Sequence, residues 1–162
     1  MKLLHSRNIY EKTAILICLI AFSALGMNLN MRNIYYNRMH FPWAVGDSGK
    51  IFRFDIDSNV ISIKSLNPEY NLTDISFVDT LIGFVVGNKP DNLGNWQGAI
   101  WKTTNSGKNW FIQIPASFYE PTPFLDIKVY NRYCVWIRCG NNYSLQTHDG
   151  GVEWLITSKP IQ

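Results

Sequence analysis

Residues 103–110 read TTNSGKNW, and the pattern returns as THDGGVEW at residues 147–154, 44 positions further along the chain. Both stretches fit Thr-x-Asp/Asn-x-Gly-x-x-Trp, through Thr103, Asn105, Gly107 and Trp110 in the first and Thr147, Asp149, Gly151 and Trp154 in the second. The Asp or Asn oxygen accepts hydrogen bonds from nearby backbone N–H groups, the Gly supplies a positive φ, and the Trp ring packs against the hairpin. A turn that recurs at a period of about 40 to 50 residues indicates a repeat architecture.

The sequence before each turn repeats as well. Asp74-Ile75 precedes the first turn and Asp126-Ile127 precedes the second, and these pairs lie 52 residues apart rather than 44. The first unit therefore carries about eight extra residues. They fall within residues 88–97, where Pro, Gly and Asn predict a loop inserted between two strands.

A third and more divergent copy of the repeat begins near Asn33. Its Val45-Gly46 matches Val86-Gly87, but its turn at residues 55–59 lacks the motif. Short runs of Ile, Val, Phe, Tyr and Trp, separated by Gly, Asn, Asp and Pro, predict antiparallel strands throughout. Four such strands in each unit are typical of a β-propeller blade. We therefore predict an all-β domain over residues 31–162, with blades at about 31–67, 68–116 and 117–162.

Beyond the turns, the fuller pattern Asp-Ile-x-Phe-x-Asp, Gly-Phe-x-Val-Gly and Ile-x-Lys-Thr is present in the middle unit. With these motifs the chain resembles the BNR/Asp-box repeat proteins, and in particular the propellers related to the photosystem II stability and assembly factor. The resemblance covers residues 33–157. It implies a propeller that acts as a scaffold or assembly chaperone and has no catalytic activity. Asn105 in place of the usual Asp and the lost first turn depart from the family pattern.

Chain length sets the predicted propeller apart from a closed ring. About three blades fit, whereas propellers close with about four to eight. Another protein or a second copy of the chain is therefore expected to cover the open ends. The sequence does not decide between these two partners.

The first 30 residues have the composition of an export segment. Lys2, Arg7 and Lys12 precede an apolar run, and residues 13–31 carry no charge. This pattern predicts a hydrophobic helix that is either a cleaved signal peptide or, in the interpretation that we favour, a single-pass transmembrane anchor. The β domain is then expected to lie outside the cytoplasm, which means the periplasm in a bacterium.

Catalytic and cofactor signatures are missing from the sequence. The three histidines, His5, His40 and His148, are scattered, and no spacing suits zinc or a nucleotide-binding loop. Asp-box turns also occur in sialidases, which makes a glycosidase fragment a remote alternative. Arg53, Arg132 and Arg138 are available for such a site, but three blades cannot enclose its central pocket. From Asn28 onward twelve basic residues face eleven acidic ones, so nucleic acid is not an expected partner either.

The expected function is protein binding. Trp96 lies in the inserted segment, where blade packing gives it no role, and aromatic residues on loops are common binding anchors. Phe118 and Tyr119, in the segment that links two units, form a second candidate site. We assign Trp101, Trp110, Trp136 and Trp154 to blade packing. The chain is interpreted as a membrane-tethered scaffold or assembly factor, or alternatively as an immunity or inhibitor protein that neutralises an extracytoplasmic toxin or hydrolase.

Overall fold

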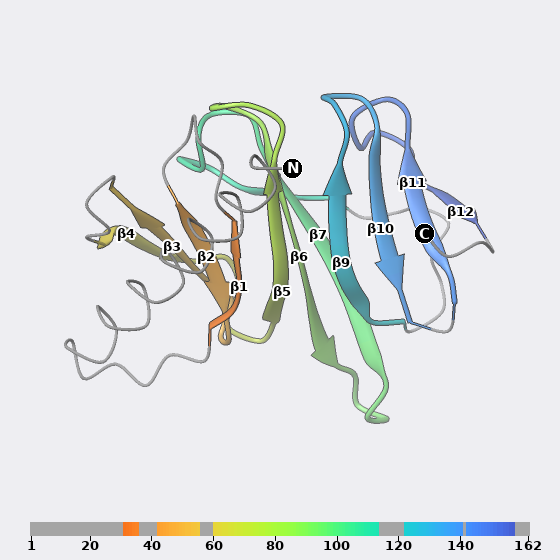
Figure 1. The fold of residues 1–162 in the computed structure, drawn as a ribbon. Helices are drawn as coiled ribbons and strands as arrows, with labels where there is room; N and C mark the ends of the chain where they lie inside the picture. The colour runs from red at the N-terminus through yellow and green to blue at the C-terminus, as the bar shows by residue number, and fades with distance from the viewer. Residues whose placement is uncertain (1–30, 36–41, 56–59, 114–121, 141, 158–162) are drawn as a thin grey trace, which may run out of the picture.

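The computed structural model describes residues 31–35, 42–55, 60–113, 122–140 and 142–157, whose regular structure is entirely β (Figure 1). The first sheet contains β1 (Met31–Tyr35), β2 (Trp43–Gly46), β3 (Lys50–Phe54) and β4 (Val60–Ser65). The second contains β5 (Asn71–Phe77), β6 (Gly83–Pro90), β7 (Trp96–Thr103) and β8 (Phe111–Gln113). The third contains β9 (Phe124–Val129), β10 (Val135–Cys139), β11 (Ser144–Thr147) and β12 (Leu155–Thr157).

All three sheets are four-stranded antiparallel meanders in which consecutive strands are neighbours. The predicted all-β architecture of three such units is therefore confirmed. The predicted N-terminal helix, residues 1–30, lies outside the described residues. Within the described part of the chain, no helix has the length and apolar character needed to cross a membrane.

Strand pairing repeats from sheet to sheet with the offsets seen in the sequence. Val45 pairs with Ile51 across β2 and β3, and Val86 pairs with Ile100 across β6 and β7. The first strand of each sheet has a register shift just before Asn33, Asp74 or Asp126. Such a bulge adds one residue and re-aims the side chain that follows it. Asn33, Asp74 and Asp126 thus occupy one equivalent position in the three sheets.

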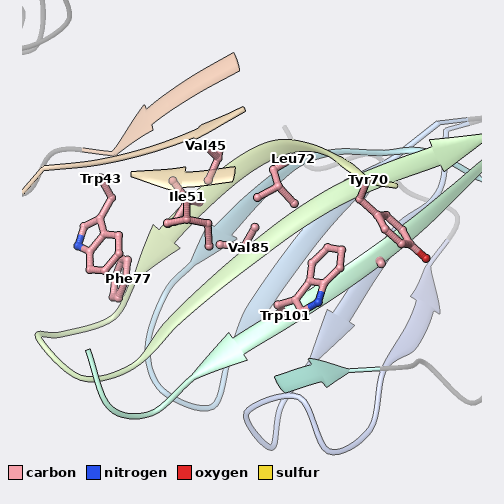
Figure 2. Packing of buried hydrophobic residues seen from close by; sticks show 10 residues of the cluster. Trp43, Val45, Ile51, Tyr70, Leu72, Phe77, Val85 and Trp101 are labelled. Carbon is pink, nitrogen blue, oxygen red and sulfur yellow. The ribbon is translucent and has the colours of Figure 1, made fainter. Parts of the chain in front are cut away.

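The sheets pack face to face with their first strands close together, so that β5 contacts both β1 and β9 (Figure 1). Between the first and second sheets lies a buried cluster that includes Trp43, Val45, Leu72, Phe77 and Trp101 (Figure 2). A second buried cluster, between the second and third sheets, includes Phe84, Val86, Phe124, Ile137 and Trp154. These two clusters are the apolar burial that joins the three sheets. A third buried cluster, Ala44, Phe52 and Phe54, lies in the first sheet.

The insertion in the second unit differs from the predicted loop. Strand pairing continues through Asn88↔Gly98 and Lys89↔Gln97 to Pro90↔Trp96, so only residues 91–95 form a turn. The added residues lengthen the β6–β7 hairpin, which projects beyond the other strands (Figure 1). The sequence prediction of a loop was wrong because Pro90 suggested a break, whereas Pro is tolerated where a strand edge faces solvent.

Candidate protein-binding surfaces

The two repeated turns share most of their hydrogen bonds. In the second turn, the Thr147 hydroxyl donates to Asp149 Oδ1 at 2.7 Å and accepts from the Gly151 N–H at 2.9 Å. Asp149 Oδ1 accepts from Val152 N at 2.9 Å and from Glu153 N at 3.1 Å. The Thr147 hydroxyl and the backbone N–H of Glu153 hold the pKa of the Asp149 carboxyl below its usual range.

In the first turn, the Thr103 hydroxyl accepts from Gly107 N at 3.0 Å, and Asn105 Oδ1 accepts from Asn109 N at 2.9 Å. Gly107 and Gly151 both have positive φ, at 69° and 96°. Asn105 therefore performs the acceptor role of the Asp in the family pattern, with fewer hydrogen bonds because only one of its terminal atoms can accept.

Each turn packs on the sheet that precedes it. A Cβ on Gly107 would lie 2.5 Å from the Trp43 ring, and one on Gly151 would lie 3.6 Å from the Phe84 ring. Trp43 and Phe84 are equivalent positions, two residues before Val45 and Val86. The repeated turn therefore joins neighbouring sheets as well as its own strands.

Trp110, at the end of the first turn, completes an aromatic group with Trp43 and Phe77. Its ring is perpendicular to both, with centroid distances of 6.4 Å and 6.0 Å. Its buried indole N–H has no hydrogen-bond partner among the described residues. Packing, rather than a hydrogen bond, places this ring.

Asp74 joins all three sheets. Its Oδ1 accepts from Asn33 Nδ2 and from its neighbour Ile75 N, both at 2.8 Å, and its Oδ2 accepts from Ile127 N at 2.9 Å. Burial nevertheless raises the pKa of Asp74 to about 6, and the nearby Asp126 carboxylate acts in the same direction. In the sequence, the signal for this residue is that Asn33, Asp74 and Asp126 each precede an Ile at the same place in the repeat. Its contacts with the other two sheets could be found only from the structure.

The tip of the β6–β7 hairpin is a fixed turn. Asp91 Oδ1 accepts from Leu93 N and Asn95 N, both at 2.8 Å, and Asp91 N donates to Asn95 O at 2.7 Å. Gly94 supplies the required positive φ of 83°. Desolvation opposes ionisation of Asp91, but the N–H groups of Asn95 and Leu93 outweigh it and hold its pKa below the usual value.

The base of the hairpin is anchored to the third sheet. The buried Asn88 side chain accepts from Phe124 N at 2.6 Å and donates to Phe124 O at 2.8 Å, which is the pairing that a backbone strand would make. Gly98 N donates to Thr122 O at 3.0 Å. A Cβ on Gly98 would lie 2.5 Å from the Phe124 ring, so glycine is needed for this approach. With both ends fixed, the hairpin is a rigid projection.

The hairpin presents apolar side chains to solvent. Trp96 is 46% exposed and Leu93 is 87% exposed. Trp96 lies on β7 rather than in a loop, directly opposite Pro90. Phe118 and Tyr119, the second predicted binding site, lie outside the described residues.

The outer face of the third sheet is a second surface of interest. Here Trp136 is only partly buried and belongs to none of the three core clusters, so the described residues do not show the blade packing predicted for it. Trp136 is equivalent to Trp43 and Phe84, each of which receives a turn from the following sheet. Arg138, paired through Nε with Asp126 Oδ2 at 2.7 Å, stands where Val45 and Val86 lie in the inner sheets. This face therefore has an aromatic ring, Trp136, at the position that receives a turn in the inner sheets, and a charged residue, Arg138, next to it.

Solved structures share this fold. The structure titled "YCF48 bound to D1 peptide" matches with a TM-score of 0.64 and 18% identity, over 79% of this chain and 39% of that chain. YCF48 from Cyanidioschyzon merolae matches with a TM-score of 0.63 and 18% identity, over 79% of this chain and 37% of that one. The fold is that of a partial propeller. The chain spans about two fifths of the length of these proteins.

These matches confirm the predicted resemblance to the photosystem II assembly-factor propellers at the level of fold. No family model matches the chain. No curated protein is similar enough in sequence to count as a relative.

The groups considered for catalysis do not converge in the described part of the chain. Arg53 lies over the Trp43 ring, Arg138 pairs with Asp126, and Arg132 lies 3.8 Å from Asp79. His148 is exposed within its turn. No group of three or more His, Cys, Asp or Glu side chains in the described ranges could hold a metal ion.

Proposed function

We propose that this protein is a non-catalytic protein-binding module of the scaffold or assembly-factor type. Its N-terminal segment would tether it to a membrane, with the sheets outside the cytoplasm. The observation that carries this proposal is the β6–β7 hairpin, which is longer than the third sheet requires, rigid at both ends, and tipped with an exposed Trp and Leu. Rigid aromatic anchors of this kind are typical binding hot spots because they lose little entropy on association.

The shared fold supports the same proposal. One of the similar structures is described as bound to a D1 peptide, so a propeller of this kind is able to hold a segment of another protein. The binding residues of that protein are not transferred to this chain, because 18% identity carries the fold alone.

A projecting hairpin also suits the alternative function, an immunity or inhibitor protein. Such a protein inserts a rigid convex element into the cleft of a toxin or hydrolase, as long antibody loops insert into concave epitopes. The identity of the captured partner separates the two functions, because a hydrolase whose activity falls on binding would identify an inhibitor.

The partner that closes the propeller would dock on the outer face of the third sheet. Trp136 there is available to receive a turn, as Trp43 and Phe84 do inside the chain. The Arg138–Asp126 pair requires a polar group on whatever sheet lies against it, since an unpaired buried charge is costly. Another protein and a second copy of the chain both remain candidates, and the molar mass in solution distinguishes them.

The test of partner binding is affinity capture with the full-length, detergent-solubilised protein and its variants. Trp96→Ala is expected to weaken capture of the partner at least about tenfold and to leave the unfolding midpoint nearly unchanged. Tyr130→Ala is the matched control, because Tyr130 is 61% exposed on the third sheet, away from the hairpin. Equal capture by the wild type and Trp96→Ala would remove the hairpin from the proposal.

A further inference from the structure

The two edges of the β6–β7 hairpin extend beyond the strands that flank them. On one side, β5 pairs with β6 only as far as Asn71↔Asn88. On the other side, β8 pairs with β7 only from Ile100 onward. The last residues of both arms, including Pro90 and Trp96, are therefore strand edges with a partner on one side only.

The direction of the backbone groups along β7 follows from one hydrogen bond. Gly98 N donates to Thr122 O, on the side away from β6. Backbone groups alternate in direction along a strand, so Trp96, two residues earlier, directs its N–H and C=O to that same outer side. Beside Trp96 the structure describes no strand on that side. At this edge of β7, the N–H and the C=O of Trp96 are therefore the groups that could pair with an added β-strand.

The opposite edge, on β6, is closed to strand addition. Pro90 lies directly opposite Trp96 and has no N–H to donate. Lys89, next to it, donates to Glu69 at 3.0 Å and lies over the Tyr70 ring, which covers the approach from β5. Proteins commonly protect exposed edges with Pro and Lys. Among the described residues, a comparable Pro or Lys protects the β6 edge of the hairpin but not the β7 edge.

The unprotected edge has further features of a strand-addition site. The Trp96 ring is half-exposed beside it, Gln97 is exposed, and Gly94 at the tip has no atom within 4 Å of its Cβ position. Asp91 and Asn88 already fix the two ends of the hairpin, so binding costs little ordering of this chain.

We propose that the outer edge of β7 at Trp96 binds an extended peptide segment of a partner protein as an added β-strand. Main-chain hydrogen bonds to the N–H and C=O of Trp96 supply the register, and the indole ring packs on one side chain of the added strand. This inference rests on the proposed protein-binding function and specifies its mode. It differs from binding through side chains alone, since the backbone of Trp96 takes part.

The test uses linear peptides of about ten residues, selected from a displayed library on the full-length, detergent-solubilised protein. The matched control is a variant that lacks residues 89–96, because this deletion restores the spacing of the third unit. The selected peptides are expected to bind the deletion variant at least tenfold more weakly than the wild type. N-methylation of the one peptide residue whose N–H bonds to the Trp96 C=O is expected to abolish binding, whereas N-methylation of either adjacent residue is not. The Trp96 amide hydrogen is expected to exchange at least tenfold more slowly in the complex.

Peptides that bind the deletion variant equally well, or the recovery of no peptide, would overturn the strand-addition site. Unchanged exchange of the Trp96 amide in a complex that Trp96→Ala weakens would also overturn it. That last outcome would leave the proposed protein-binding function standing, with the side chain of Trp96 as its contact. Loss of partner capture is measured separately, so the two proposals fail independently.

Discussion

Asp74 is expected to contribute more stability in mild acid than at neutral pH, which is the reverse of the usual behaviour of a carboxylate. Its pKa is raised to about 6 in the folded protein from an ordinary value of 3.8. The folded state therefore binds a proton more tightly than the unfolded state does. Folding stability from this residue is full below the unfolded pKa and is lost as the pH rises through about 6.

The size of the effect follows from the two pKa values. Between pH 5 and pH 7 the folded carboxyl passes from mostly protonated to mostly ionised, while the unfolded carboxyl is ionised throughout. Linkage then gives about 1 kcal/mol more stability at pH 5 than at pH 7 from Asp74 alone. Asp74→Asn removes the titration, so the variant should lack this increment whatever its absolute stability.

The assay is urea unfolding of the full-length protein at pH 5 and pH 7, followed by tryptophan fluorescence. The matched control is Asp126→Asn, at the equivalent position of the third sheet, where the carboxylate pairs with the exposed Arg138. Because the Asp126 carboxylate adds to the raised pKa of Asp74 and burial is the larger cause, this variant should keep most of the pH dependence of the wild type, whereas Asp74→Asn should lose it. If Asp74→Asn keeps the full pH dependence, burial of Asp74 does not control its titration. The same conclusion follows if all three proteins lose the same amount of stability between pH 7 and pH 5.

Three further predictions concern the turns, the hairpin base and the topology. Asp149→Ala removes the acceptor for Val152 N and Glu153 N and should lower the unfolding free energy by about 1–2 kcal/mol. Gly151→Val, at a φ of 96°, should lower it by at least about 1 kcal/mol. Unchanged urea midpoints for both variants would show that this turn does not stabilise its sheet. Gly98→Val should place a side chain against the Phe124 ring and cost about 1–3 kcal/mol, more than Gln97→Val at the neighbouring exposed position of β7. The reverse order would refute the anchoring of the hairpin base. Protease added to spheroplasts should digest the sheets if they lie outside the cytoplasm. Full protection of the sheets in spheroplasts with an intact inner membrane would reverse the proposed topology.

Much of this fold is local and could be predicted from the sequence. The repeated turns at residues 103–110 and 147–154 are determined by residues within eight positions of one another, because Thr, Asp or Asn, and Gly satisfy the turn's own N–H groups. Alternation of apolar residues predicted the strands, and the matching frames predicted three sheets of four strands. The candidate Trp96 was also visible, since an aromatic residue in an insertion has no role in the repeat.

The remaining features depend on contacts between sheets, which sequence spacing does not specify. The insertion at residues 88–97 is a hairpin rather than a loop because Asn88 pairs with the backbone of Phe124, 36 residues away. Trp136 occupies the same repeat position as Trp43 and Phe84, yet it is only partly buried because the structure describes no fourth sheet whose turn would cover it. Asp74 gained its raised pKa only when three sheets met around it. The sequence determined each sheet through local hydrogen bonding and side-chain alternation. The tertiary structure decided burial and pairing across sheets, and these set the hairpin, the open face and the titration of Asp74.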